Sequence, residues 1–159
     1  MNKIRPCLWF DGDAEEAANF YVGLVPDSRI DSVSRSPTDY PAGKAGDVLT
    51  VEFRLAGQDF LGLNGGPGNP FTDAVSFQIH TEDQAETDRL WDAIAGAGGQ
   101  PVACSWIKDR WGLSWQIVPK RLTQLMQDPD PARAKRVMEA MMTMVKIDVA
   151  EIERAAAGG

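Results

Sequence analysis

The sequence predicts an α+β protein made of two strand–helix–three-strand units and a C-terminal helical appendix. Three observations predict this fold class. Runs in which apolar and polar residues alternate, as in half-buried strands, precede runs with apolar residues at every third or fourth position, as in helices. The same order of elements then occurs a second time. A stretch rich in Gly and Pro, residues 64–70, lies between the two occurrences.

Unit one is predicted over about residues 1–66, and it begins with a strand at residues 4–10. A helix follows, with Asp13 as the expected N-cap and Glu16 completing a capping box. Ala14, Tyr21 and Leu24 mark the apolar face of this helix. The next strands are predicted at residues 30–36, 48–55 and 58–63, the last two as a hairpin. A linker over about residues 64–73 ends the unit.

Unit two is predicted over about residues 74–120. It begins with a strand at residues 74–80, after which Thr81 and Gln84 form the pattern of a capping box and open a helix. Glycines at 96–99 end this helix. The remaining strands are predicted at residues 101–104, 106–108 and 113–118, the last after a tight turn at 109–112.

The C-terminal appendix is predicted over about residues 121–157, and with the two units it is expected to form a single domain, residues 1–159. A short helical turn at 121–126 precedes a helix with Pro131 at its first position. A break is expected near Lys146, because Asp148 and Glu151 have the spacing of a new helix start. The methionines at 138, 141, 142 and 144 indicate core or dimer packing.

Composition excludes several classes of partner. The formal net charge of −7 argues against nucleic acid and anionic membranes, since both need a basic face on the protein. No apolar run approaches the length of a membrane span, and the N-terminus lacks the apolar core of a signal peptide. Two cysteines cannot form a framework of disulfides, which favours a reducing compartment. We therefore expect a cytoplasmic protein.

Polar side chains alternate with large apolar ones on two of the predicted strands. Gln116 lies between Trp115 and Ile117, and Gln78 lies between Phe77 and Ile79. A period of two puts the apolar side chains on one face and the polar ones on the other. Either the polar side chains bind a ligand, or they form a buried network that joins the strands. The candidate ligand-binding residues are Asn64, Ser76, Gln78, Trp106, Ser114 and Gln116.

Other candidate residues favour structural interpretations. His80 is the one histidine, and a surface position at a strand end is preferred to a role as a metal ligand, while a proton-transfer role remains open. Cys7 and Cys104 are interpreted as small buried hydrophobic residues, because no activating group stands near either in the sequence. The glycines of residues 65–68 lack the Gly-Lys-Ser/Thr ending of a phosphate loop.

Several blocks of the sequence resemble the PhnB-like branch of the vicinal oxygen chelate superfamily, which includes glyoxalase I and fosfomycin-resistance proteins. The matching blocks are residues 8–12 (Leu-Trp-Phe-Asp-Gly), 15–17, 20–21, 60–67, 75–77, 106–119 and 128–148. The resemblance implies a glyoxalase-like fold, in which two βαβββ units form curved mixed sheets around a cup, and it implies a homodimer. The branch is also labelled demethylubiquinone methyltransferase-like. The chain lacks the Gly-rich turn after a first parallel strand that nucleotide binding uses.

The metal site of the superfamily does not carry over to this sequence. Its first-strand His falls on or near Pro6, and the ligand on the last strand of the first unit falls within residues 61–64, which hold no carboxylate or imidazole. In the second unit the His falls on Ser76 and the final Glu on Gln116. Because neutral amides and hydroxyls are poor ligands for divalent cations, no metal and no other cofactor is expected.

Three hypotheses follow from the sequence. The first is a small-molecule-binding protein whose cup has lost the usual metal site, with no specific activity assigned and no commitment to its being an enzyme. The second is a metal-dependent lyase, isomerase or dioxygenase with displaced ligands such as Glu52, Asp59 or His80. The third is a non-catalytic dimeric interaction protein whose cup is filled by its own side chains. Fold alone cannot choose among them.

Overall fold

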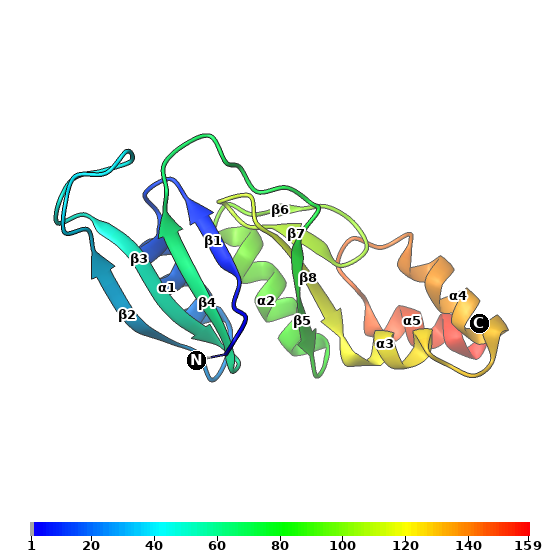
Figure 1. The fold of residues 1–159 in the computed structure, drawn as a ribbon. Helices are drawn as coiled ribbons and strands as arrows, with labels where there is room; N and C mark the ends of the chain where they lie inside the picture. Colours follow the sequence, from blue (N-terminus) through cyan, green and yellow to red (C-terminus); the bar gives the residue numbers. More distant parts are fainter. Residues whose placement is uncertain (1) are drawn as a thin grey trace. The chain divides into compact units, whose positions relative to one another are not determined.

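The structure, a computed structural model, describes residues 2–159. They divide into two compact units: the first ends at Phe71 and the second spans Thr72–Gly159. Each unit contains a mixed sheet with a helix against one face (Figure 1). Within the described residues, every helix is too short or too polar to span a membrane.

The first unit follows the predicted order of elements. Its strands join in the order β1-β4-β3-β2, with β1 parallel to β4 and the other pairs antiparallel. The turn at residues 56–57 joins β3 to β4, and both of its residues have positive φ, as a tight hairpin turn requires. The elements are β1 (Cys7–Phe10), α1 (Ala14–Leu24), β2 (Arg29–Arg35), β3 (Val48–Leu55) and β4 (Gln58–Asn64).

Alternation along the strands places the core of the first unit between the sheet and α1. Val51, Phe53 and Leu55 of β3 are buried, whereas the residues between them are partly exposed. A period of two therefore separates the two faces of the strand. The other buried apolar residues of this unit include Leu8, Phe10, Ala14, Ala17, Ala18, Tyr21, Leu24 and Phe60.

The predicted capping box at the start of α1 is wrong. Among the described residues, the Asp13 side chain accepts no capping hydrogen bond. Instead the Asn64 Oδ1 atom accepts the backbone N–H of Ala14 (2.9 Å), and Asn64 Nδ2 donates to the Val48 carbonyl oxygen (2.9 Å). A side chain from the end of β4 thus satisfies a free N–H at this helix start.

The second unit repeats the topology of the first. Its strands join in the order β5-β8-β7-β6, again with the first strand parallel to the last. The predicted repeat of element order is therefore confirmed. The elements are β5 (Ser76–Thr81), α2 (Gln84–Gly96), β6 (Gln100–Pro101), β7 (Trp106–Lys108) and β8 (Ser114–Pro119).

Two local predictions in this unit are wrong. The cap of α2 is Asp83, whose side chain accepts the Glu86 N–H, while the Thr81 hydroxyl bonds to that of Thr87. The strand predicted at 101–104 is confined to β6, because Cys104 and the residue after it adopt positive φ, which no strand residue does.

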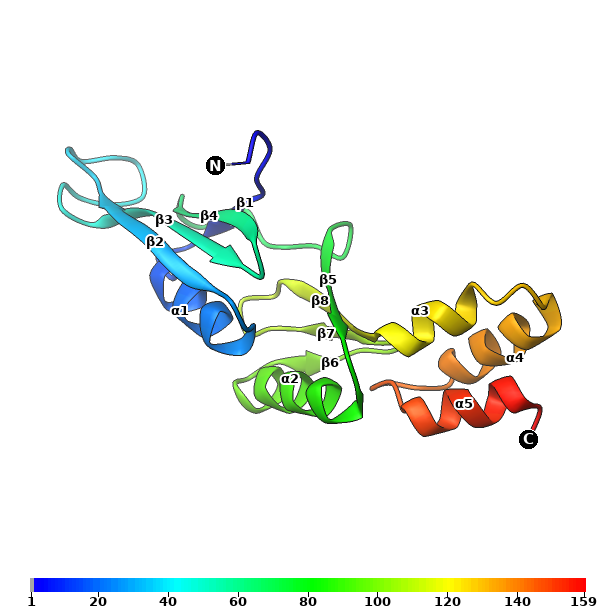
Figure 2. The same ribbon diagram turned by 90° about the horizontal axis from the view of Figure 1, so that it is seen from below.

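The C-terminal helices lie side by side within the second unit (Figure 2), and their buried apolar side chains form a small core. Asp130 caps α4, whose first residue is Pro131 as predicted, and Asp148 caps α5 after the predicted break. Helix α4 ends before Met144 and Val145, so these residues lie in the connector to α5. The helices are α3 (Lys120–Met126), α4 (Pro131–Met141) and α5 (Val149–Ala157). Their core contains Val118, Leu122, Leu125, Val137, Ile147, Ile152 and Ala156.

Candidate functional site on the second sheet

Strand register brings most of the candidate ligand-binding residues onto one face of the second sheet. Gln78 pairs with Gln116 between β5 and β8, and Trp106 pairs with Gln116 between β7 and β8. Ser76 pairs with Ser114 in the same ladder. Residues paired in register share a face, so these five side chains lie opposite the apolar face that α2 covers. The residues of the apolar face are Phe77, Ile79, Ile107, Trp115 and Ile117.

Three of these side chains form a hydrogen-bonded chain, which we call the polar row: Ser76, Gln78 and Gln116. Gln116 Nε2 donates to the Ser76 hydroxyl oxygen (2.8 Å), and Gln78 Nε2 donates to Gln116 Oε1 (3.0 Å). Gln78 is exposed, and the other two are half-buried. A glutamine amide offers two N–H donors and two acceptor lone pairs, so each amide keeps capacity beyond these bonds.

A second polar group adjoins the polar row. The Ser114 hydroxyl, which is fully buried, donates to Asp73 Oδ1 (2.9 Å), and Lys108 Nζ lies 3.1 Å from the same oxygen. The hydrogen bond from Lys108, followed by that from Ser114, lowers the pKa of Asp73 below its ordinary value. Because its hydroxyl is engaged, Ser114 serves here to hold Asp73. Lys108 could have been predicted to lie on this face, because it is two residues after Trp106 on the same strand. Asp73 could not, because it lies in a loop before β5, where no periodic pattern applies.

The remaining predicted site residue, Asn64, belongs to the first unit. Its side chain is 5% exposed, and both ends of its amide bond to backbone groups, as described for the start of α1. Asn64 thus has a capping role. His80 is exposed on β5, at the strand end expected from the sequence.

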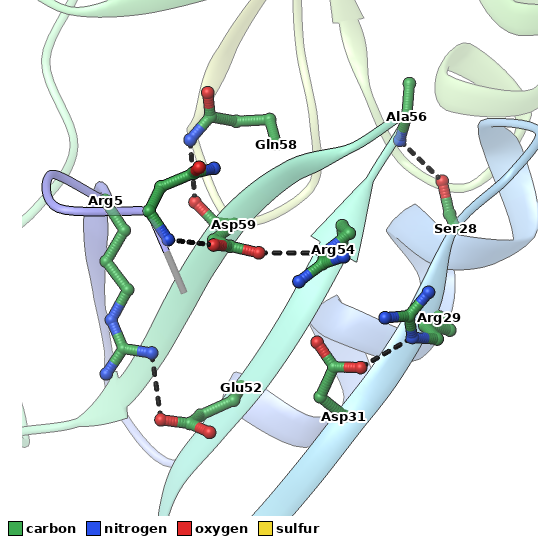
Figure 3. A network of polar contacts seen from close by, with 10 residues as sticks. Arg5, Ser28, Arg29, Asp31, Glu52, Arg54, Ala56, Gln58 and Asp59 are labelled. Carbon is green, nitrogen blue, oxygen red and sulfur yellow. Dashed lines mark hydrogen bonds and ion pairs between the residues drawn. The ribbon is translucent and has the colours of Figure 1, made fainter.

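The two carboxylates considered as displaced metal ligands are engaged by arginines on the first sheet (Figure 3). Glu52 Oε1 accepts from Arg5 Nη1 (2.8 Å), and Asp59 Oδ1 accepts from Arg54 Nε (2.8 Å). These four side chains line a pocket of about 170 Å³ together with Asp31, Phe53 and Phe60. The Arg5 hydrogen bond lowers the pKa of Glu52, and the Asn2 backbone N–H, then Arg54, lowers that of Asp59. We call these two ion pairs the carboxylate clasp.

The side chains present do not fit the metal site of the superfamily. Gln116 and Ser76, on which the resemblance placed two of its ligand positions, are neutral and hydrogen-bonded to each other. Within residues 2–159, no cluster of three or more His, Cys, Asp or Glu side chains could hold a metal ion. The amide and hydroxyl groups of Gln116 and Ser76 are therefore suited to hydrogen bonding and poorly suited to coordinating a divalent cation.

The cysteine and glycine predictions have different outcomes. Cys7 is exposed, so its predicted burial is wrong, and Cys104 is half-buried. Partial desolvation nevertheless raises the pKa of the Cys7 thiol, which disfavours the nucleophilic thiolate.

Gly65 lies against Trp9, whose ring atoms would be 2.3 Å from an added Cβ, and Trp9 Nε1 donates to the Gly66 carbonyl (2.8 Å). The glycine run thus packs against an indole.

A protein-family model described as 3-demethylubiquinone-9 3-methyltransferase matches residues 2–118. The chain belongs to this family. A Bacillus cereus protein described as a 3-demethylubiquinone-9 3-methyltransferase, PhnB protein, is 34% identical in sequence, with a TM-score of 0.66. The match covers 74% of this chain and 99% of that one. The resemblance to the PhnB-like branch and the glyoxalase-like fold are both confirmed.

Other solved structures extend the likeness of fold. Protein PA1353 from Pseudomonas aeruginosa is 18% identical with a TM-score of 0.61, and the match covers 75% of this chain and 98% of that one. No curated protein matches this PhnB-like chain. The family model ends at Val118, so the tail block at 128–148, which entered the resemblance, lies outside the match. About a quarter of the chain has no counterpart in the Bacillus cereus protein.

Proposed function

We propose that the chain binds a small polar molecule on the face of the second sheet that carries the polar row. One observation supports this most directly: Ser76, Gln78 and Gln116 form a continuous hydrogen-bonded chain that still has unused donors and acceptors. Small-molecule sites commonly combine a few converging polar groups with apolar and aromatic walls. Trp106, half-buried and in register with Gln116, supplies such a wall.

The free hydrogen-bonding groups define the class of ligand. An amide side chain both donates and accepts, so it pairs best with a group that also does both, such as a carboxamide, a urea or a cyclic imide. An indole favours a flat partner for stacking. The ligand is therefore a planar molecule that carries an amide-like group, and no reaction is assigned to it.

Benzamide is a suitable probe, because it combines a flat ring with a primary amide. In a titration followed by NMR, benzamide should shift the side-chain NH₂ signals of Gln78 and Gln116 and the indole signal of Trp106. Gln116→Leu should weaken this binding by about 5- to 150-fold, since a polar group of the ligand left buried without a partner costs about 1–3 kcal/mol. The melting temperature should change little, because the half-buried Gln116 lies outside the apolar core.

Toluene, which has the ring without the amide, is the matched control ligand and should leave the glutamine signals unchanged. Gln127→Ala, at an exposed position after α3, is the control variant. If Gln116→Leu lowers the melting temperature while benzamide binding persists, the polar row joins the strands and benzamide binds elsewhere, which rejects the proposal.

The alternatives have less support. Metal-dependent lyase, isomerase or dioxygenase chemistry would use displaced ligands such as Glu52, Asp59 or His80. Each of the two carboxylates already accepts a hydrogen bond from an arginine, and within residues 2–159 His80 belongs to no cluster of three or more potential ligands. Methyl transfer, which the family description names, has less support because residues 11–13, between β1 and α1, are Asp-Gly-Asp and not the Gly-rich turn of nucleotide-binding folds. We also propose a homodimer, which the resemblance supports, and a cytoplasmic location, which the composition and the cysteine count support.

A further inference from the structure

Two adjacent residues next to the polar row have an unfavourable backbone conformation. Cys104 has a φ of 51° and Ser105 a φ of 81°, although neither is glycine. Residues with a Cβ rarely adopt positive φ, and they keep it only where the surroundings hold them there. Trp106 follows directly and begins β7. The direction in which its strand starts therefore depends on this pair, which we call the 104–105 turn.

The connector between α4 and α5 holds the 104–105 turn. The backbone N–H of Cys104 donates to the Met144 carbonyl (2.9 Å), and that of Ser105 donates to the Val145 carbonyl (3.0 Å). On the other side, the Ser105 carbonyl accepts the N–H of Ile117 in β8 (2.9 Å). The turn is thus bonded between the connector and the strand that carries Gln116, and Ser105 is only 3% exposed.

One side chain at the start of α2 fixes the connector in turn. Gln84 Oε1 accepts the Val149 N–H (2.7 Å), and Gln84 Nε2 donates to the Ile147 carbonyl (3.0 Å). Lys146 Nζ, next to Ile147 in sequence, pairs with Asp88 of α2 (2.9 Å). Gln84 makes no hydrogen bond to the polar row itself. It fixes the connector between α4 and α5, and the connector fixes the 104–105 turn.

We propose that the C-terminal helices position the ligand-binding face: through Gln84 and the connector they hold the 104–105 turn, and the turn places Trp106 opposite Gln116. This inference rests on the proposed function, because it treats Trp106 as a wall of the site. The match with the family model ends at Val118. The connector therefore lies outside the matched residues, whereas Trp106, which it helps to position, lies within them. Gln84 is a positioning residue, and so is Lys146.

Gln84→Ala tests the proposal on the full-length protein, with Gln127→Ala as the matched control. Two readouts need no ligand: amide hydrogen exchange at Cys104 and Ser105, and the ¹⁹F signal of Trp106 in protein labelled with 5-fluorotryptophan, assigned through Trp106→Phe. Gln84→Ala should speed exchange at both amides at least tenfold and shift or broaden the Trp106 signal. Amides of β3 in the first unit should exchange as before.

A second variant guards against misfolding. Lys146→Met removes the ion pair to Asp88 and should give the same changes on a smaller scale. The proposal is overturned if Gln84→Ala matches Gln127→Ala in both readouts. It is overturned equally if exchange rises throughout the second unit, because the helices would then act only on general stability. Failure of benzamide to bind the unmodified protein would reject the proposed function, whereas the exchange rates would still decide whether the connector holds the turn.

Discussion

At the scale of single residues, Asp109 organises the turn that leads into the central strand of the second sheet. One of its carboxylate oxygens accepts the backbone N–H groups of Trp111 and Leu113 (both 3.0 Å), and the other accepts the indole N–H of Trp115 (3.0 Å). Asp109 is 3% exposed. Gly112 closes the turn with a φ of 88°. A single carboxylate therefore satisfies several buried donors.

Replacement of Asp109 should be costly. Asp109→Ala leaves these buried N–H groups without their acceptor and should lower the free energy of unfolding by about 2–4 kcal/mol. Asp109→Asn, which keeps one acceptor oxygen, should lose less. Urea denaturation measures the differences, with exposed Asp11→Ala as the control. A loss for Asp109→Ala no larger than that for Asp11→Ala would show that the turn forms without its carboxylate.

Residue roles were the hardest feature to predict from the sequence. The turn at 109–112 was predicted, because Gly and Asp mark turns locally. Asn64 caps a helix that starts 50 residues earlier, which depends on a contact between distant parts of the chain. The bond from Trp115 to Asp109 is local in sequence but depends on how the turn folds back on the strand that follows it. The sequence did not reveal this capping role of Asn64, since a polar residue at a strand end has the same local pattern whether it caps a helix or binds a ligand.

At the scale of elements, alternation and helical spacing identified the sheets, α1 and α2, because both signals come from burial of one face. The ends of elements were predicted less well. Both capping boxes failed because other side chains, Asn64 and Asp83, satisfy the helix starts. The strand register places Gln78, Trp106 and Gln116 side by side on one face of the sheet. Alternation within each strand indicates the face of each residue but not which residues are neighbours.

The carboxylate clasp should make the stability of the first unit depend on pH. Its pKa values are lowered in the folded state, for Glu52 chiefly by Arg5 and for Asp59 chiefly by the Asn2 amide. Lowered carboxylate pKa values contribute stability that is fully present above the ordinary values of about 4 and is lost as the pH falls through the folded values. Urea midpoints should therefore drop more steeply from pH 5 to pH 3 than those of an Arg5→Met, Arg54→Met variant. Equal slopes would mean that the clasp contributes nothing.

At the scale of the whole molecule, the two units share a topology but differ on the sheet face opposite the helix. Trp9 pairs with Leu63 in the first unit as Gln78 pairs with Gln116 in the second. The repeated backbone therefore carries an apolar pair in one unit and an amide pair in the other. Element order predicted the repeat, whereas this division of chemistry between the units became visible only from the register.

The absence of charged donors at the superfamily's ligand positions predicts metal content. Protein purified without chelator should hold far less than one equivalent of zinc, nickel, manganese or iron by elemental analysis. Installing donors with Ser76→His and Gln116→Glu, at side chains 2.8 Å apart, should raise zinc uptake in equilibrium dialysis. A stoichiometric metal bound by side chains of the unmodified protein would reject the hydrogen-bonding interpretation of the site.

The sheet order leaves β2 at the edge of the first sheet, where the open side of a strand can recruit other chains. This strand reads Arg-Ile-Asp-Ser-Val-Ser-Arg, is mostly exposed, and pairs with β3 through two register irregularities. Charges and a broken register make a poor template for further strand addition. We therefore expect this edge to resist strand addition by other chains, even at high protein concentration.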